Sequence, residues 1–335
     1  MKVIYPLILV ISLSIMSYLG ALAGLDFLLG VVIPYISALL FVLGFTWRIF
    51  DWMKSPVPFR IPTTSGQAKS LDWIKKDELE SPSGFLGVLG RMSMEVLFFR
   101  SLFRNTKAEM APGPRLTYGS NKWLWVAGML FHWTLLIIVL RHYRFFLTPV
   151  PGFVEILEKI DGFLQITFPT FYITDLLLIF AVTFLLFRRL VSAQMRIISL
   201  STDYFPLFLI LAITLSGISM RYIEKVDVVA VKVLIQGLLS FNFQNPGKIG
   251  AIFYVHLFLV CVLIGYFPFS KLMHMGGIFL SPTRNLANNS RVKRHINPWN
   301  PDVQFRTYEE YEEEFREKMV KADLPTDTPL KLEKK

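Results

Sequence analysis

Six long runs of apolar residues, separated by polar segments, dominate the chain. The runs cover residues 4–24, 29–50, 121–147, 170–187, 203–220 and 250–273. A helix needs about 20 mainly apolar residues to cross the hydrocarbon core of a bilayer, and each run is close to that length. The pattern predicts an all-α, polytopic transmembrane helix bundle of about six spans.

Three of the intervening segments mix apolar residues at helical spacing with charges, which is typical of amphipathic helices at a membrane interface. They are GFLGVLGRMSMEVLFFRSLFRNT at 84–106, GFVEILEKIDGFLQI at 152–166 and YIEKVDVVAVKVLIQGLLSF at 222–241. The last two fall on the same side of the predicted bundle. They either cap a pocket that opens into that leaflet or simply pack at the interface.

The pattern divides the chain into four parts. These are two N-terminal transmembrane helices in 1–50, a loop with an interfacial helix in 51–120, a four-helix core in 121–275 and a soluble tail in 276–335. Within the tail, TYEEYEEEFREKMVKA at 307–322 is acidic and then basic, which predicts either a solvated helix or a docking surface for a partner.

Composition supports the membrane assignment, because 53% of the residues are hydrophobic and the mean hydropathy is +0.48. The net charge of +10 gives no evidence of nucleic-acid binding, because the basic residues flank the spans. Segments that face the cytoplasm when the chain begins inside carry 21 Lys and Arg before residue 300, and the opposite loops carry seven. The positive-inside rule therefore predicts a cytoplasmic (inner) membrane protein with both termini in the cytoplasm.

Two further features limit the chemistry. Lys2, the apolar run after it and Ala21-Leu22-Ala23 resemble a signal peptide, so residues 1–23 are either a cleaved signal or a retained anchor. The topology of the later spans is the same in both cases. Cys261 is the only cysteine, which excludes an intrachain disulfide, a covalently attached c-type haem and an iron–sulfur cluster held by this chain alone.

Four of the five histidines lie in or at the edge of two apolar runs, where ionisable side chains are costly and often functional. His132 and His142 are ten residues apart in the third run, and His256 and His274 are eighteen apart in the last. Neutral imidazole is a common ligand of haem iron. Two helices with two imidazoles each could hold two bis-histidine b haems, one at each side of the membrane.

Depth fixes the expected pairing, because three connections separate the two helices and they must be antiparallel. His132 then lies near the inner surface with His274, and His142 lies near the outer surface with His256. Eighteen residues are five helical turns, so a continuous last helix, kinked at Pro268, would place His256 and His274 on one face.

Other interpretations of these residues remain. Membrane histidines also form hydrogen bonds between helices or relay protons, so a membrane anchor, proton relay or transporter without haem is the alternative function. Zinc is disfavoured because the histidines form two distant pairs. Gly128 would let a flat macrocycle approach the helix, or would allow close helix packing. Arginines and lysines at the two depths are candidate partners for haem propionates: Arg144, Arg221 and Lys248 outside, Lys271 and Arg284 inside.

The segment YVHLFLVCVLIGYFPFSKLMH resembles the last span of the gamma subunit of respiratory nitrate reductase, a dihaem cytochrome b. That family also has histidines ten apart on one helix and eighteen apart on the last, and it pairs them crosswise. The resemblance covers about 121–290 and implies that His132 and His274 hold an inner haem, and that His142 and His256 hold an outer one. The additional N-terminal span, the long loop and NPWNPDVQF look more like the membrane subunit of sulfite-reduction-associated, heterodisulfide-reductase-like menaquinol oxidoreductase complexes.

This resemblance implies exchange of menaquinol near the outer haem and electron delivery to a cytoplasmic Fe–S subunit of the heterodisulfide-reductase type, in either direction. Further membrane and periplasmic cytochrome subunits are possible partners, and the lipid bilayer is the immediate environment. Candidate residues around the quinone are Arg144, Lys159, Tyr172 and Asp175. The family's quinol-site lysine has no close match here, since Lys159 is only roughly placed.

Overall fold

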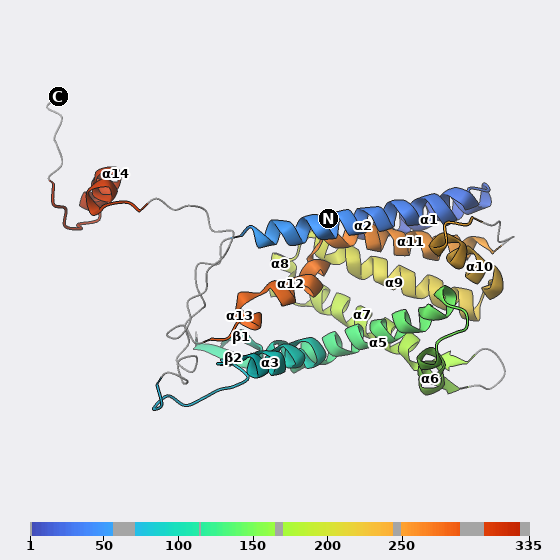
Figure 1. Cartoon of the computed structure of the whole chain (residues 1–335), viewed down its shortest axis with the longest axis horizontal. Coiled ribbons are helices and arrows are strands. Elements are labelled where there is room, and N and C mark those ends of the chain that lie inside the picture. The colour runs from blue at the N-terminus through green and yellow to red at the C-terminus, as the bar shows by residue number, and fades with distance from the viewer. Residues whose placement is uncertain are drawn as a thin grey trace, which may run out of the picture.

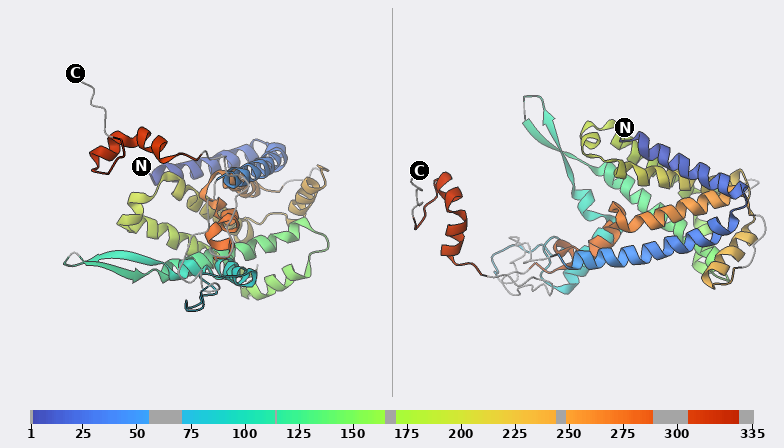
Figure 2. Two further views of the ribbon diagram at one scale, coloured as in Figure 1. Left: turned by 60° about the vertical axis from the view of Figure 1, so that its left-hand side comes forward. Right: turned by 90° about the horizontal axis from the view of Figure 1, so that it is seen from above.

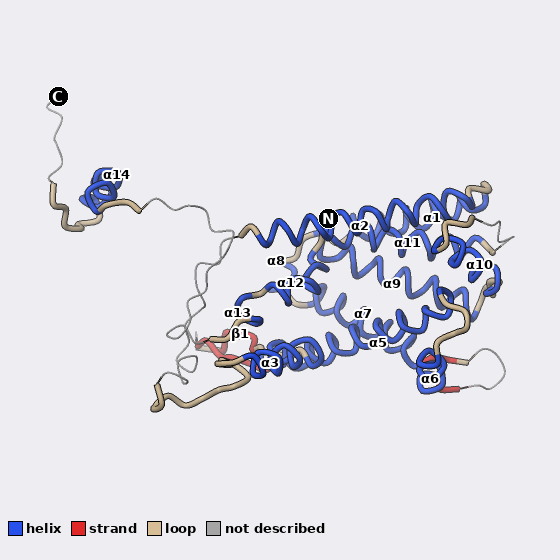
Figure 3. The backbone as a smooth tube through the Cα atoms, in the orientation of Figure 1, coloured by secondary structure: helices blue, strands red, loops and turns tan. Residues whose placement is uncertain are grey.

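The structure is a computed structural model, and it describes residues 2–55, 71–113, 115–164, 170–243, 249–288 and 305–328. Long helices lie side by side along one axis and form an elongated bundle (Figure 1). Helices dominate the described chain, and its strands form two short antiparallel pairs (Figure 3). The expected all-α bundle is confirmed.

Every predicted span is occupied by a helix. The six long helices are α1 (Ile4–Leu22), α2 (Ile33–Met53, preceded by the π-helical turn Leu28–Val32), α5 (Lys122–Phe146), α7 (Ile173–Val191), α9 (Ser201–Tyr222) and α11 (Ala251–Tyr266). Five of them, all except α7, are long and apolar enough in their described residues to cross a membrane, with α2 counted from Leu28 and α11 counted through Phe269. Helix α7 has 19 residues but carries Asp175 in its first turn and Arg188 and Arg189 in its last.

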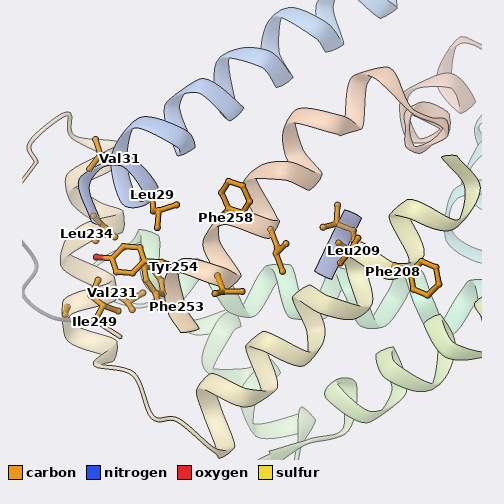
Figure 4. Close-up of a cluster of buried hydrophobic side chains, with 14 of the residues drawn as sticks. Leu29, Val31, Phe208, Leu209, Val231, Leu234, Ile249, Phe253, Tyr254 and Phe258 are labelled. Atoms are coloured by element: carbon orange, nitrogen blue, oxygen red, sulfur yellow. The ribbon is translucent and has the colours of Figure 1, made fainter. Parts of the chain in front are cut away.

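The N-terminal helices are an integral part of the bundle, since α1 contacts α9 and α11, and α2 packs along α11. A core of buried side chains joins them, which includes Leu29 and Val31 before α2 and Tyr254 and Phe258 of α11 (Figure 4). At the crossing of α2 over the end of α11, a Cβ on Gly44 would lie 2.9 Å from both Pro268 and Phe269. A glycine at this position therefore permits close approach.

Short elements cover the two ends of the bundle (Figure 1). One end carries α3 (Phe85–Phe98), α4 (Arg100–Arg104), α8 (Ala193–Ile198), α12 (His274–Leu280) and α13 (Pro282–Asn285). The other carries α6 (Gly152–Asp161), α10 (Val228–Leu239) and the paired strands β3 (Gly162–Leu164) and β4 (Phe171–Tyr172). The three amphipathic segments expected from the sequence thus contain helices α3 with α4, α6 and α10.

The hairpin of β1 (Thr106–Ala111) and β2 (Arg115–Ser120) was not expected from the sequence. It projects away from the bundle (Figure 2). Helix α14 (Tyr308–Lys321) is the expected tail helix, and it begins with a capping box formed by Thr307 and Glu310. The basic segment around His295, the NPWNPDV motif and Lys248 lie outside the described residues.

The expectation of one continuous, kinked last helix is wrong. Helix α11 ends at Tyr266, two 3₁₀ turns follow at Phe267–Phe269 and Lys271–Met273, and His274 begins α12. Proline removes a helical N–H donor and clashes with the preceding turn, and extended Ser270 completes the break at Pro268. His256 and His274 are therefore carried by different helices.

Candidate functional site

The four membrane histidines lie in two pairs at opposite ends of the bundle. The ring centres of His132 on α5 and His274 on α12 are 5.9 Å apart, with nearly perpendicular ring planes. The centres of His142 on α5 and His256 on α11 are 6.4 Å apart, with nearly parallel planes. The structure thus brings together the residues that the antiparallel argument paired.

All four rings are oriented by a hydrogen bond at Nδ1. Three of them bond a carbonyl oxygen on their own segment: His132 that of Gly128 at 2.8 Å, His142 that of Ile138 at 2.7 Å and His274 that of Lys271 at 2.8 Å. His256 reaches across to α9, where it lies 3.1 Å from the Ile213 carbonyl and 3.0 Å from the Ser216 hydroxyl. Metal-ligating histidines usually donate their second ring N–H in this way, which fixes the tautomer.

This arrangement fits a metal between each pair. None of the four Nε2 atoms has a hydrogen-bond partner among the described residues. Bonds from imidazole nitrogen to a transition metal are about 2 Å long, so two rings on opposite sides of one ion have centres about 6 Å apart. Both pairs match this spacing. Among the described residues, no cluster of three or more His, Cys, Asp or Glu side chains could hold a metal ion.

Two aromatic side chains contact His132. The rings of Phe99 and Phe131 both meet His132 edge-on at 4.9 Å. Phe99 links α3 to α4 in the left-handed conformation, with φ of 49°. Such a conformation costs a non-glycine residue about 1–2 kcal/mol, and here it turns the short α4 toward α5.

The small residues near the histidines serve close packing. A Cβ on Gly217 would lie 3.2 Å from Cε1 of His256, so this glycine leaves room for the ring between α9 and α11. A Cβ on Gly128 would lie 3.2 Å from Leu102 of α4. At Gly128, the alternative of helix packing is therefore the one that the structure displays.

A buried polar network adjoins the His142 pair. Arg141, next to His142 in the chain, is 7% exposed and forms ion pairs with Asp161 at 3.1 Å and Asp175 at 3.3 Å. Asp161 also accepts hydrogen bonds from the backbone and hydroxyl of Thr174. The guanidinium of Arg141 lies 3.7 Å from the ring centre of Tyr172. Because charged groups are costly to bury unless paired, this network joins α5, α6 and α7.

The four candidate quinone residues all lie around this end of the bundle. Tyr172 is buried, with Arg141 on its ring and Arg221 at 4.1 Å. Asp175 accepts a hydrogen bond from the Tyr222 hydroxyl at 3.1 Å. Arg144 pairs with Glu158 of α6 at 2.6 Å, and Lys159 is exposed on the same helix. Tyr172 and Asp175 thus share one network, while Arg144 and Lys159 belong to the contact with α6.

The candidate propionate partners have different surroundings. Arg221 donates to the Thr170 carbonyl, and Lys271 pairs with Asp203 at 2.7 Å. Arg284 lies 3.9 Å from Glu95 of α3.

The sequence reasoning did not identify Arg141, Asp161 or Tyr222. The one available signal was an arginine directly before a histidine near the end of a predicted span.

Comparison with known proteins matches residues 116–295 to the family model of the nitrate reductase gamma subunit. The chain belongs to this family. Two relatives cover 81% of the chain, and both are named Hdr-like menaquinol oxidoreductase cytochrome b-like subunit. The protein of Archaeoglobus fulgidus is 46% identical, with 83% of its length covered, and that of Archaeoglobus profundus is 40% identical, with 82% covered. The family resemblance inferred from the histidine motif is confirmed.

All four histidines fall within the part of the chain that the family model covers. The similarity to the two archaeal relatives extends well beyond that segment, since about 280 residues align. The branch expected from the N-terminal spans and the long loop is therefore supported by similarity over 81% of the chain, while the four histidines lie in the segment matched to the gamma subunit family.

Proposed function

We propose that this chain is the membrane cytochrome b subunit of a menaquinol oxidoreductase complex associated with sulfate or sulfite respiration. The observation that carries the proposal is the geometry of the four histidines, each with a hydrogen bond at Nδ1 and with its ring centre 5.9 or 6.4 Å from that of its partner. The names of the two archaeal relatives supply the donor, menaquinol. Bound haem b supplies reversible one-electron transfer, which suits a subunit between a two-electron quinol and an Fe–S partner.

The residues of the chain have defined roles in this proposal. His132 and His274 hold the inner haem iron, and His142 and His256 hold the outer haem iron. Their Nδ1–H donors keep each ring aimed at the iron and raise its basicity as a ligand. Menaquinol binds beside the outer pair, among Arg144, Lys159, Tyr172 and Asp175, where carboxylate and hydroxyl groups accept or pass on its protons.

The proposed orientation places both termini in the cytoplasm, because the basic residues concentrate in the segments on that side. The His132 pair then lies at the cytoplasmic end, close to α3 and α4. A heterodisulfide-reductase-like Fe–S subunit docks at that end, since this chain has one cysteine and cannot hold a cluster by itself.

The haem content of the purified subunit tests the proposal. We expect two haem b per chain in the pyridine haemochrome assay. His132→Ala or His274→Ala should remove one haem, and His142→Ala or His256→Ala the other, because each iron would lose one of the two imidazoles that would hold it. His295→Ala is the matched control and should retain both. A colourless wild-type protein would exclude the function and favour a haem-free anchor or proton relay.

The donor is tested separately by spectroscopy. When a menaquinol analogue is mixed with the oxidised protein, the absorption bands of reduced haem b should appear. Haems that respond to dithionite but never to quinol would leave the cytochrome assignment intact and exclude menaquinol as the partner.

A further inference from the structure

A cavity of about 630 Å³ opens beside His274, at the end of the bundle that carries the His132 pair. Its walls come from α2, the start of α9 and the broken segment between α11 and α12. The charged side chains in its lining, apart from His274 itself, are Arg48 of α2 and Lys271. Lys271 is already neutralised by Asp203 at 2.7 Å. Arg48 is therefore the cation in this lining that has charge left to offer a ligand.

Arg48 lies beside two indoles, and one of its guanidinium nitrogens lacks a polar partner among the described residues. Its guanidinium lies 5.9 Å from the ring centre of Trp47 and 5.5 Å from that of Trp52. Its Nε is buried and has no hydrogen-bond partner among the described residues. Burying a guanidinium N–H without an acceptor costs free energy. A ligand with an acceptor oxygen next to Arg48 would remove this cost.

Two glycines of α12 lie against side chains of α2. A Cβ on Gly276 would contact Phe45 and Ile49, and one on Gly277 would lie 3.4 Å from the indole of Trp52. Residues 45, 48, 49 and 52 share one face of a helix. The contact that brings Phe45, Ile49 and Trp52 onto α12 therefore also directs Arg48 toward the cavity beside His274.

We propose that Arg48 binds a propionate carboxylate of the haem held by His132 and His274, so that the N-terminal helix α2 completes the inner haem site. This inference rests on the proposed function. Guanidinium presents two parallel N–H donors that match a carboxylate, whereas a quinone offers neutral carbonyl oxygens that do not require a cation. Arg48 precedes residue 116, so it lies outside the segment matched to the gamma subunit family.

Arg48→Gln tests the proposal in the full-length, haem-loaded protein, with redox titration followed at the haem absorption bands. The His142→Ala variant, which keeps the inner haem, identifies the inner component. Loss of the cation should shift the inner midpoint potential to lower values, because a positive charge near the iron disfavours the oxidised form. The inner potential should also become more dependent on pH, since an unpaired propionate titrates closer to neutrality. The outer component should not move.

Arg196→Gln is the matched control, because it removes an exposed arginine from α8 at the same end of the bundle. It should leave both potentials unchanged. If Arg48→Gln loses the inner haem altogether, Arg48→Lys should retain it. Loss from both variants with the outer haem intact would overturn the carboxylate contact and indicate a packing role.

Two other results would also overturn the inference. One is an Arg48→Gln protein with the haem content, potentials and pH dependence of the wild type. The other is unchanged haem behaviour together with weakened binding of a quinone analogue, which would make the cavity a quinone site. A wild-type protein without haem would instead overturn the proposed function itself.

Discussion

Single residues in this protein combine two tasks, which is clearest at Arg141. It precedes His142 on α5, and its buried guanidinium joins Asp161 of α6 to Asp175 of α7. Ion pairs with this burial stabilise poorly in themselves, but removal of one partner leaves an uncompensated charge. Arg141 therefore fixes the position of three elements around the pair of His142 and His256.

Arg141→Met should lower the free energy of unfolding by about 3–5 kcal/mol, because Asp161 would stay buried without its partner. It should also lose the outer haem more readily than the inner one. Thermal unfolding of the solubilised protein, followed at the haem bands, measures both effects. Arg144→Met is the control: its ion pair with Glu158 is half-exposed, and such pairs contribute about 0–1 kcal/mol. Equal losses in the two variants would contradict a special role for Arg141.

In the tail, the single carboxylate of Glu312 joins helix α14 to the segment that follows it. Although burial would raise its pKa, hydrogen bonds from the amides of Asp327 and Thr328 and from Arg316 lower the pKa of Glu312 from its ordinary 4.5 to about 2. A carboxyl with a lowered pKa stabilises the folded state above its ordinary pKa. This stabilisation is lost as the pH falls from about 4.5 through about 2.

Glu312→Gln should therefore speed hydrogen exchange at the amides of Asp327 and Thr328 in the intact protein at neutral pH. The difference from the wild type should shrink as the pH is lowered toward 2, where Glu312 itself becomes protonated. Glu313→Gln, an exposed neighbour, should change nothing. Equal exchange in the wild type and Glu312→Gln at neutral pH would mean that the carboxylate does not hold the end of the tail.

At the scale of elements, α3 is attached to the bundle by two tryptophans of α5. The indole N–H of Trp125 donates to the Phe98 carbonyl at 2.7 Å, and that of Trp133 to the Leu97 carbonyl at 3.1 Å. Carbonyls in the last turn of a helix have no partner within the helix. These indoles satisfy two of them and hold α3 next to the His132 pair.

Trp125→Phe with Trp133→Phe should loosen α3, since each indole hydrogen bond contributes about 1 kcal/mol. We expect faster hydrogen exchange across residues 85–98, measured by mass spectrometry of the solubilised protein. Trp123→Phe removes an indole that is 76% exposed and should leave exchange unchanged. Unaltered exchange in the double variant would show that contacts between α4 and α5 suffice to hold this segment.

Sequence patterns predict elements better than the joints between them. The runs of apolar residues located all six long helices because burial and lipid exposure both require apolar side chains. Pro268 predicted a kink, but a break depends on extended Ser270 and on the packing of Gly44 over Pro268, which no single-residue signal carries. The left-handed conformation of Phe99 likewise depends on tertiary packing and has no signal in the local sequence. The β1–β2 hairpin has a turn signal in the sequence, Ala111-Pro112-Gly113, which the periodicity of apolar residues does not register.

At the scale of the whole molecule, the two ends of the bundle differ in their construction. Helix α6 covers the end with the His142 pair. Two arginines of α5 hold it there through ion pairs, Arg141 with Asp161 and Arg144 with Glu158. At the other end, the loop before α5 and the segment after α12 are joined. Arg91 of α3 donates to the Leu286 carbonyl, and the Asn288 amide donates to that of Pro82.

Part of the candidate site was predictable from the sequence, namely the pairing of the four histidines. Depth along antiparallel helices follows from the chain order, so His132 and His142 could be matched to their partners without coordinates. The Arg141 network and the Arg48 cavity required coordinates, because each assembles residues from elements far apart in the sequence. The assignment of haem to the four histidines stays a prediction that the spectra of the variants will decide.

The surface at the His132 end leads to a last prediction, on the partner subunit. Helix α14 begins with Glu309 and Glu310 and ends with Lys318 and Lys321, so it presents charges of both signs. Charged rims of interfaces mainly steer association and weaken at high salt. Deletion of residues 300–335 should therefore reduce co-purification of the Fe–S subunit. The residual binding of that subunit should depend less on salt concentration than binding to the full-length chain. Both haem signals should stay intact. A truncated protein that keeps its partner fully would make the tail a solvated end, and the docking role would pass to α3 and α4, which lie next to the His132 pair.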